Sequence, residues 1–492
     1  MKHLLLFICL IWGIKVQASD YYELNKRLLL AQEEISKLKL KTAEAIIQEE
    51  IRLNPENLAA LYYLNYVDCY KILIGQNKSD YLKFKSKVEE RIERFENWNC
   101  ATNEKSIVLT QLELHLGFSK ILHNEYIGAG LNFRTAFKLS KALYEKEPFN
   151  LNNQKNYGLL YAAIGTFPEQ YKWVLRSIGL EGNFNDGIQI LGEFIEKSSS
   201  KHELKTEHAE ALFAYSYLLL NFGRSKKATW EFVKNYTSNY SDNIALCYLR
   251  ALTAEKCFQS EECIKVISKK PIGLDFEQIG LFDYLMGSAK MNLLEMDADI
   301  WLKKFVSFSS SNFQKKDAYR KLSWHAMLNG NIDKFKIYRN LSLKYQSNSL
   351  EEQLVSYDLD LNVYPNKNLI KARLLFDGGL FKKSLQSCFT IQVNELKSSY
   401  QLIELEYRLG RNYQEMENEI KAKIHFKKCL EFKNPPHTYL LPNTCLQLAY
   451  IFEKSGDFNQ ARFYFKKVFT YKDYEYKQSI YQEAKNGLAK LQ

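Results

Sequence analysis

The sequence predicts an all-α protein, a right-handed α-solenoid built from stacked helix hairpins. Residues that break helices are rare, because the 492-residue chain holds only 8 prolines and 21 glycines. Apolar residues recur at the spacing of an amphipathic helix, and several glycines fall where one helix would turn into the next. Since a single helix pair cannot bury its apolar stripe alone, neighbouring pairs are expected to stack around a shared core.

The first 18 residues predict a secretory signal peptide that is cleaved after Ala18. Lys2 precedes an apolar run from Leu4 to Ile14, which is too short to cross a hydrocarbon core of about 30 Å. We therefore expect an exported, soluble protein in a periplasm or at an outer membrane, rather than a fully extracellular one. An uncleaved anchor is the alternative, and a glycosylation sequon at Asn235 leaves an exported eukaryotic protein open as well.

The clearest hairpins lie near the C-terminus. In LAYIFEKSGDFNQARFYFKKVF (448–469), large apolar residues build an inner face, small alanines let the two helices approach, and a glycine supplies the turn. The positions that carry this pattern are Leu448, Ala449, Phe452, Gly456, Ala461 and Phe465, and in the preceding unit Leu409, Gly410, Tyr413, Ala422 and Phe426. These two stretches resemble the tetratricopeptide repeat, a helix–turn–helix unit of about 34 residues.

Weaker hairpins around Gly330 and Gly379, and others near the N-terminus, extend the repeat pattern along the chain. The expected organisation is a signal peptide (1–18), N-terminal tetratricopeptide-like helices (19–110), a helical segment with a Gly-rich hairpin (111–265), degenerate helical repeats (266–398) and the clearest repeats (399–492).

Residues 158–191 depart from the plain repeat, because five glycines cluster there around Pro168. Such clustering indicates tight turns or close approach of backbones, and the apolar Trp173 and Leu175 predict a buried helix. The spacing of Pro168, Gly179, Gly182, Asp186, Gly187 and Leu191 resembles the inclusion-body clearance family of tetratricopeptide proteins, over about residues 110–265. The resemblance implies the fold and the order of elements, with a hint of work beside a membrane or lipid deposit. The signal peptide departs from that family, whose members are cytosolic.

No pattern predicts catalysis or a cofactor. The chain lacks the phosphate-loop, nucleophile-elbow and dinucleotide-binding motifs. His202 and His208 are six residues apart, whereas zinc ligands on one helix face need a spacing of four. Cys257 and Cys263 are candidates for a disulfide that would staple a hairpin turn, with two buried thiols as the alternative.

The formal net charge of +11 is spread along a chain in which acids and bases alternate. Solvated helix faces explain that pattern better than a nucleic-acid groove does, so no nucleic-acid partner is expected, while weak attraction to a membrane surface remains an alternative. The first helices of such repeats line the concave groove, so Tyr407, Arg411, Asn443 and Tyr450 are the candidates for partner binding.

These observations predict an exported, non-enzymatic scaffold that binds a peptide or a partner helix in its concave groove. Two alternatives stand beside it: a peripheral membrane or lipid-associated protein that docks through residues 158–191, and an enzyme whose site lacks a known motif. Burial of Trp173 and Leu175 would favour the scaffold, whereas an exposed apolar patch would favour docking to a membrane or a partner.

Overall fold

The computed structural model describes residues 19–100, 103–167, 169–309, 314–345, 364–432 and 438–491, with side chains at 169–171 left out. The predicted signal peptide and Pro168 lie outside these residues. Regular structure in the described ranges is helical, apart from one isolated bridge between Tyr21 and Asn57. The prediction of an all-α solenoid is therefore confirmed, and none of the described helices is both long and apolar enough to cross a bilayer.

The helices of the first half are α2 (Lys26–Ser36), α3 (Leu40–Leu53), α4 (Leu58–Gly75), α5 (Lys78–Asn97), α6 (Glu104–Leu122), α7 (Tyr126–Lys146), α8 (Leu151–Gly165), α9 (Glu169–Ser177), α10 (Phe184–Ser198), α11 (Lys205–Phe222), α12 (Lys226–Tyr236), α13 (Ile244–Lys256) and α14 (Ser260–Ser268). Those of the second half are α15 (Leu281–Asn292), α16 (Ala298–Phe308), α17 (Lys315–Leu328), α18 (Ile332–Leu343), α20 (Lys367–Asp377), α21 (Phe381–Phe389), α22 (Ser399–Glu415), α23 (Glu419–Cys429), α24 (Leu440–Lys454), α25 (Phe458–Val468) and α26 (Lys477–Lys490). Single 3₁₀ turns lie at His202–Leu204, Tyr240–Asp242 and Val393–Glu395.

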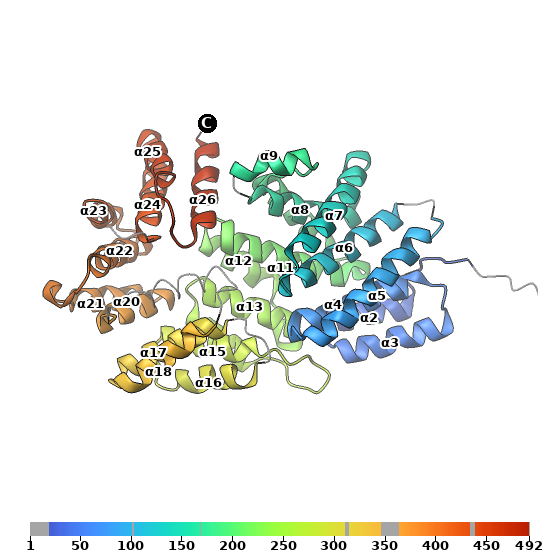
Figure 1. Ribbon diagram of the computed structural model, residues 1–492, viewed down its shortest axis with the longest axis horizontal. Helices are drawn as coiled ribbons and strands as arrows, with labels where there is room; N and C mark the ends of the chain where they lie inside the picture. The colour runs from blue at the N-terminus through green and yellow to red at the C-terminus, as the bar shows by residue number, and fades with distance from the viewer. Residues whose placement is uncertain are drawn as a thin grey trace, which may run out of the picture.

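Successive helices pack in pairs, and the pairs stack side by side into a curved superhelix (Figure 1). Many of these helices begin at an asparagine whose side chain accepts a hydrogen bond from a backbone N–H of the first turn, as at Asn25, Asn77, Asn331 and Asn418. Such caps satisfy amide groups that have no partner inside the helix. Frequent asparagine caps, more than glycine turns, therefore define where the helices begin.

The repeat positions near the C-terminus occupy the core that the pattern predicts. Leu448, Ala449, Ala461 and Phe465 are fully buried, and a glycine with a left-handed φ of +79° follows α24 at position 456. In the preceding unit Ala422 and Phe426 are also fully buried. Gly410 has a packing role, because a Cβ there would lie 2.6 Å from the ring of Phe426.

The Gly-rich segment forms a tight crossing between α8 and α10, which confirms the predicted close approach of backbones. A Cβ at Gly187 would lie 2.3 Å from the backbone nitrogen of Ala162, and one at Gly165 would lie 2.3 Å from that of Phe184. Real Cβ atoms essentially never come so close. Glycine is therefore required on both helices for them to cross at this distance.

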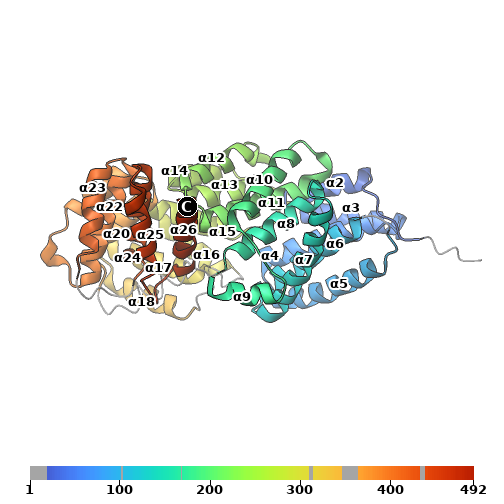
Figure 2. The same ribbon diagram turned by 90° about the horizontal axis from the view of Figure 1, so that it is seen from above.

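The prediction of a buried helix within this segment is wrong. Helix α9 lies on the outside of the molecule beside α7 and α8 (Figures 1 and 2), and 70% of the surface of Trp173 is exposed. Val174 and Ile178 are exposed as well, whereas Leu175 is half-buried against the core. Helix α9 has nine residues and packs only one side against the core, so the apolar side chains on its other sides face solvent.

The predicted disulfide between Cys257 and Cys263 is not formed in the structure, where both residues are free and buried. Cys257 ends α13, and the thiol of Cys263 in α14 points to the carbonyl of Leu285 on the next hairpin at 4.0 Å. Burial raises the pKa of the Cys257 thiol to about 11. These thiols pack as small apolar side chains, which was the alternative interpretation of the pair.

Candidate interaction site

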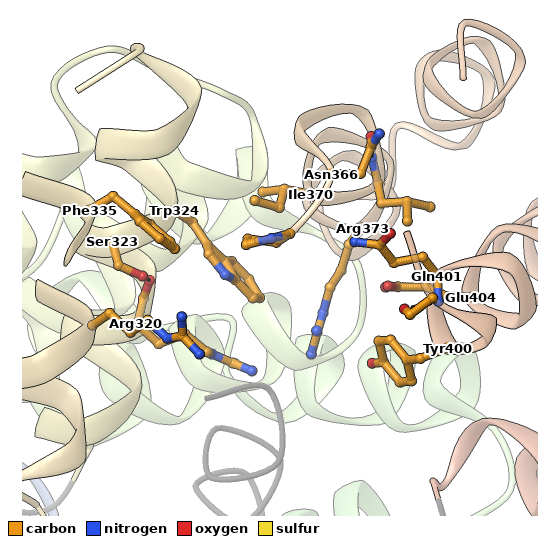
Figure 3. Close-up of a pocket in the computed structure, with 14 residues that line it drawn as sticks. Arg320, Ser323, Trp324, Phe335, Asn366, Ile370, Arg373, Tyr400, Gln401 and Glu404 are labelled. Carbon is orange, nitrogen blue, oxygen red and sulfur yellow. Dashed lines mark hydrogen bonds between the residues drawn. The ribbon is translucent and has the colours of Figure 1, made fainter. Parts of the chain in front are cut away.

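A pocket opens in the second half of the solenoid, where α17, α18, α20 and α22 meet. Figure 3 shows Arg320, Ser323 and Trp324 of α17 on one side and Gln401 and Glu404 of α22 on the other, with Ile370 and Arg373 of α20 between them. Because α17, α20 and α22 are each the first helix of a hairpin, the pocket is built from the helices expected to line the concave surface. It is the candidate interaction site.

Two arginines lie against the same indole ring in this pocket. The guanidinium carbon of Arg320 is 4.5 Å from the centre of the Trp324 ring, and that of Arg373 is 4.9 Å from it. Cations prefer the face of a tryptophan, and the planar guanidinium can stack there while its N–H groups still donate to anions. The Trp324 ring thereby holds the two guanidinium groups at the same pocket.

Among the described residues, the pocket lining carries more basic than acidic side chains. Its described lining contains three basic residues, Arg320, Arg339 and Arg373, and one acidic residue, Glu404. The carboxylate of Glu404 pairs with Arg408 at 3.2 Å. Arg320 also pairs with Asp317, one turn earlier on α17. A concave surface with more cations than anions concentrates anionic groups from solution.

Asp317 holds two of the basic side chains of α17 in place. Its carboxylate contacts Arg320 and Lys321 and accepts a hydrogen bond from the Tyr284 hydroxyl at 2.7 Å. Burial alone would raise its pKa, but the charges of Lys321 and Arg320 hold the pKa of Asp317 well below its usual range. Asp317 therefore stays ionised and fixes both cations on α17.

The partner-binding candidates from the sequence lie close to the pocket on α22 but do not line it. Tyr407 is only 3% exposed and packs against Phe426 and Tyr439, so the expectation that its side chain points into the groove is wrong. Arg411 pairs with Glu415 at 2.9 Å and lies 5.2 Å from the ring of Phe376. The pocket is lined by the first two turns of α22, whereas both candidates lie further along the helix.

The other two candidates lie on α24, and each has a partner within the chain. Asn443 accepts a hydrogen bond from Gln447 at 2.9 Å. The Tyr450 hydroxyl donates to Glu483 of α26 at 2.8 Å. Whether these residues bind a partner stays a prediction. The pocket residues missed by the sequence analysis carried a signal, since an arginine and a tryptophan one helical turn apart on a first helix would have pointed to Arg320 and Trp324.

In the first half, the helices at corresponding positions are α4, α6, α8 and α11, and a buried polar network joins them. Lys155 of α8, 2% exposed, contacts the carboxylate of Glu210 on α11 and donates to Gln111 Oε1 at 2.6 Å. His115 of α6 lies 3.4 Å from the same carboxylate. Burial would raise the pKa of Glu210, but the charge of Lys155 holds it well below its usual range.

A second buried carboxyl in this network behaves differently. Glu207 of α11 accepts a hydrogen bond from Tyr62 at 3.3 Å, and its other oxygen is buried without a hydrogen-bond partner in the described part of the chain. Burial raises the pKa of Glu207 to about 7. The network therefore contains one firmly ionised acid and one that is half-protonated near neutral pH.

Comparison with known proteins identifies the repeat. A family model of the tetratricopeptide repeat matches residues 404–435 and 442–473, which are the two units with the clearest pattern. No curated protein matches the chain.

Several solved structures match the chain over most of its length. A human IFIT1 dimer with PPP-AAAA is 13% identical, with 89% of this chain and 99% of that chain covered and a TM-score of 0.31. Yeast Tom70 is 13% identical over 95% and 97% of the two chains, with a TM-score of 0.30. The APC/C hetero-tetramer Cut9–Hcn1 is 12% identical over 94% and 95%, with a TM-score of 0.25. At TM-scores this low, these likenesses carry no argument about this chain's site. The chain is an α-solenoid of helix hairpins, and its residues 404–435 and 442–473 match the tetratricopeptide repeat.

Proposed function

We propose that this protein is an exported, non-enzymatic scaffold that binds a segment of a protein partner, an extended peptide or a helix, along its concave surface. The observation that carries the proposal is the pocket at α17, α18, α20 and α22. Tetratricopeptide repeats present a concave surface to which peptides and helices bind through side-chain pockets. Export rests on the signal-peptide pattern of residues 1–18.

The pocket suits a partner segment that carries carboxylates beside apolar side chains. Trp324, Phe335 and Ile370 supply apolar surface, and Arg320 and Arg373 supply donors with the fork geometry that matches a carboxylate. Tryptophan and arginine are also the residues most enriched among those that dominate binding energy at protein interfaces. The chemistry of the lining therefore favours recognition over catalysis.

A pull-down tests this proposal. The chain from residue 19 is immobilised and exposed to the cell-envelope fraction of its source, and the double variant Arg339→Gln/Arg373→Gln is run in parallel. A partner captured by the wild type should be reduced at least tenfold by the double variant, because both guanidinium groups are lost while the helices remain. Arg52→Gln, on an exposed pair with Glu49 of α3, is the matched control. Equal capture by the wild type and the double variant would remove the pocket as the binding site.

A second candidate function is docking to an anionic membrane surface, and the exposure of α9 favours it. Trp173 is 70% exposed, and on neighbouring α7 Ile127 is 86% exposed, with Leu131 exposed one turn further on. Arg134 follows on the same face of α7 and donates to the carbonyl of Ile178 at 2.9 Å. Exposed apolar side chains among basic ones suit the boundary between lipid headgroups and acyl chains. The resemblance of residues 110–265 to proteins that work beside lipid supports the same candidate.

Vesicle flotation separates this candidate from the scaffold. Vesicles of phosphatidylcholine with phosphatidylglycerol should carry the wild-type chain upward, whereas Trp173→Asp/Ile127→Asp should stay at the bottom. Leu274→Asp, at an apolar residue that is 95% exposed outside this region, is the control and should still float. Wild-type chain that fails to float on these vesicles would exclude the membrane candidate.

A further inference from the structure

The solenoid closes on itself through the turn between α11 and α12. Helix α26 returns to the end of α11, close to the start of α12 in Figure 1, and α11 and α26 are joined by direct contacts. The Ser479 hydroxyl of α26 contacts the carbonyl of Asn221 at the end of α11. Arg224, three residues later in the turn, reaches across to α24. These regions are more than 200 residues apart in sequence, so the contact joins two distant parts of the solenoid.

Arg224 is held by three side chains of the last repeat. Its Nη1 lies 3.0 Å and 3.2 Å from the two carboxylate oxygens of Glu453. Its guanidinium carbon lies 5.3 Å from the ring centre of Tyr450 and 5.7 Å from that of Phe465. A carboxylate beside two aromatic faces is the environment in which proteins bind guanidinium groups.

The aromatic side of this site is itself fixed from α26. The Tyr450 hydroxyl donates to Glu483 at 2.8 Å, so the ring is held in place beside Arg224. Phe465 is fully buried and packs against Gly487 of α26, where a Cβ would lie 2.4 Å from the ring. The site is therefore built by α24, α25 and α26 together, without a contribution from the turn that fills it.

Arg224 does not use all of its hydrogen-bonding groups in this site. Its Nε and Nη2 are buried, and within the described residues neither has a hydrogen-bond partner. Buried donors without partners weaken an interaction, because they have lost their water and gained nothing in exchange. A segment whose own arginine found acceptors for the corresponding two nitrogens would compete effectively with the chain's own turn.

We propose that Glu453, Tyr450 and Phe465 form an arginine-recognition site, filled in the closed chain by Arg224 and open to an arginine-bearing segment of a protein partner when the turn withdraws. The site lies on the last repeat, apart from the pocket at α17–α22, and presents negative charge where that pocket presents positive charge. It extends the proposed scaffold function with a second surface and a different partner chemistry.

A peptide with the sequence of the turn tests the proposal. A fluorescent peptide of residues 221–229 is titrated by anisotropy against the chain from residue 19, as wild type and as Arg224→Ala. The variant should bind the peptide at least tenfold more tightly than the wild type, because its site is empty. A peptide with alanine in place of arginine should lose this binding, as should the double variant Arg224→Ala/Glu453→Gln.

Several outcomes would overturn the proposal: equal affinity of the peptide for wild type and Arg224→Ala, no binding to either, or binding unchanged by Glu453→Gln. Arg224→Gln serves as a second variant should Arg224→Ala lose its helical circular dichroism, and Arg52→Ala is the matched control for loss of an arginine. The variant Arg339→Gln/Arg373→Gln should bind the peptide like the wild type. Failure of the arginine site and failure of the proposed pocket are therefore distinguishable.

Discussion

The two halves of the solenoid use the same helix hairpins but treat the inner faces of their first helices in opposite ways. In the first half, the opposite charges of Lys155 on α8 and Glu210 on α11 meet in a buried network, and His115 of α6 lies beside the same carboxylate. In the second half, Arg320 and Arg373 flank Trp324 at a pocket whose described lining contains more basic than acidic side chains. The difference teaches that charged side chains on the first helices can either fill the inner face as a buried network or line a pocket, and only the pocket is a candidate for recognition.

The largest expected effect comes from breaking the balanced network. Lys155→Met should lower the free energy of unfolding by about 3–5 kcal/mol, because it leaves the buried carboxylate of Glu210 without its cation. Urea unfolding followed by circular dichroism measures the change. Adding Glu210→Gln should restore part of the loss. The half-exposed pair of Lys71 and Glu44 is the control, and Lys71→Met should cost less than about 1 kcal/mol. A loss that is no larger for Lys155→Met would show that the network is not structural.

A smaller effect is expected at the α8–α10 crossing that supports this network. Gly187→Ala should destabilise the chain by about 3 kcal/mol, because its Cβ would lie 2.3 Å from the backbone of Ala162, which cannot move freely. Gly130→Ala on α7 has open space around the new Cβ and should stabilise the helix by about 0.5–1 kcal/mol. Opposite signs in urea unfolding support a crossing that requires glycine, and equal changes contradict it.

The network should also make stability depend on pH through Glu207. Burial raises the pKa of this carboxyl to about 7, so between its unfolded value near 4.5 and pH 7 the folded chain holds a proton that the unfolded chain releases. Its contribution to stability is therefore present at low pH and falls as pH rises through this window. Glu207→Gln should remove the fall and raise the free energy of unfolding at pH 8 by about 3 kcal/mol. A pH profile unchanged by the substitution would contradict this role.

The smallest expected effect on stability lies in the pocket. Arg373→Gln removes a cation from the face of Trp324 and should change the free energy of unfolding by no more than about 1 kcal/mol. Its effect on partner capture should be much larger than its effect on folding. A loss of stability as large as that of Lys155→Met would show that Arg373 stabilises the fold as Lys155 does, and the two halves would then not differ in the role of their charged residues.

The helices could be predicted from the sequence because breakers are few and the repeat pattern is explicit in residues 399–492. The tight glycine crossing could be predicted too, since clustered glycines have few other uses. The exposure of Trp173 could not, because an amphipathic nine-residue helix carries the same apolar residues whether one face or two are covered. Tyr407 was misplaced because the pocket is lined by the first two turns of α22, up to Glu404, whereas Tyr407 lies one turn further on and is buried in the core.

The contacts that join distant parts of the chain lay beyond sequence analysis altogether. Arg224 follows a glycine and precedes a serine in an ordinary turn, and nothing around it indicates that Glu453 will pair with it. That pairing depends on the curvature of the whole solenoid, which accumulates from small angles between successive hairpins.

Hydrogen–deuterium exchange on the chain from residue 19, free and bound to the partner captured in the pull-down, tests the central claim most directly. The account predicts new protection of backbone amides in α17, α20 and α22, with α4, α6, α8 and α11 unchanged because their inner faces are already filled. Protection confined to α4–α11, or to the exposed α9, would contradict the claim that the second half of the solenoid carries the recognition surface.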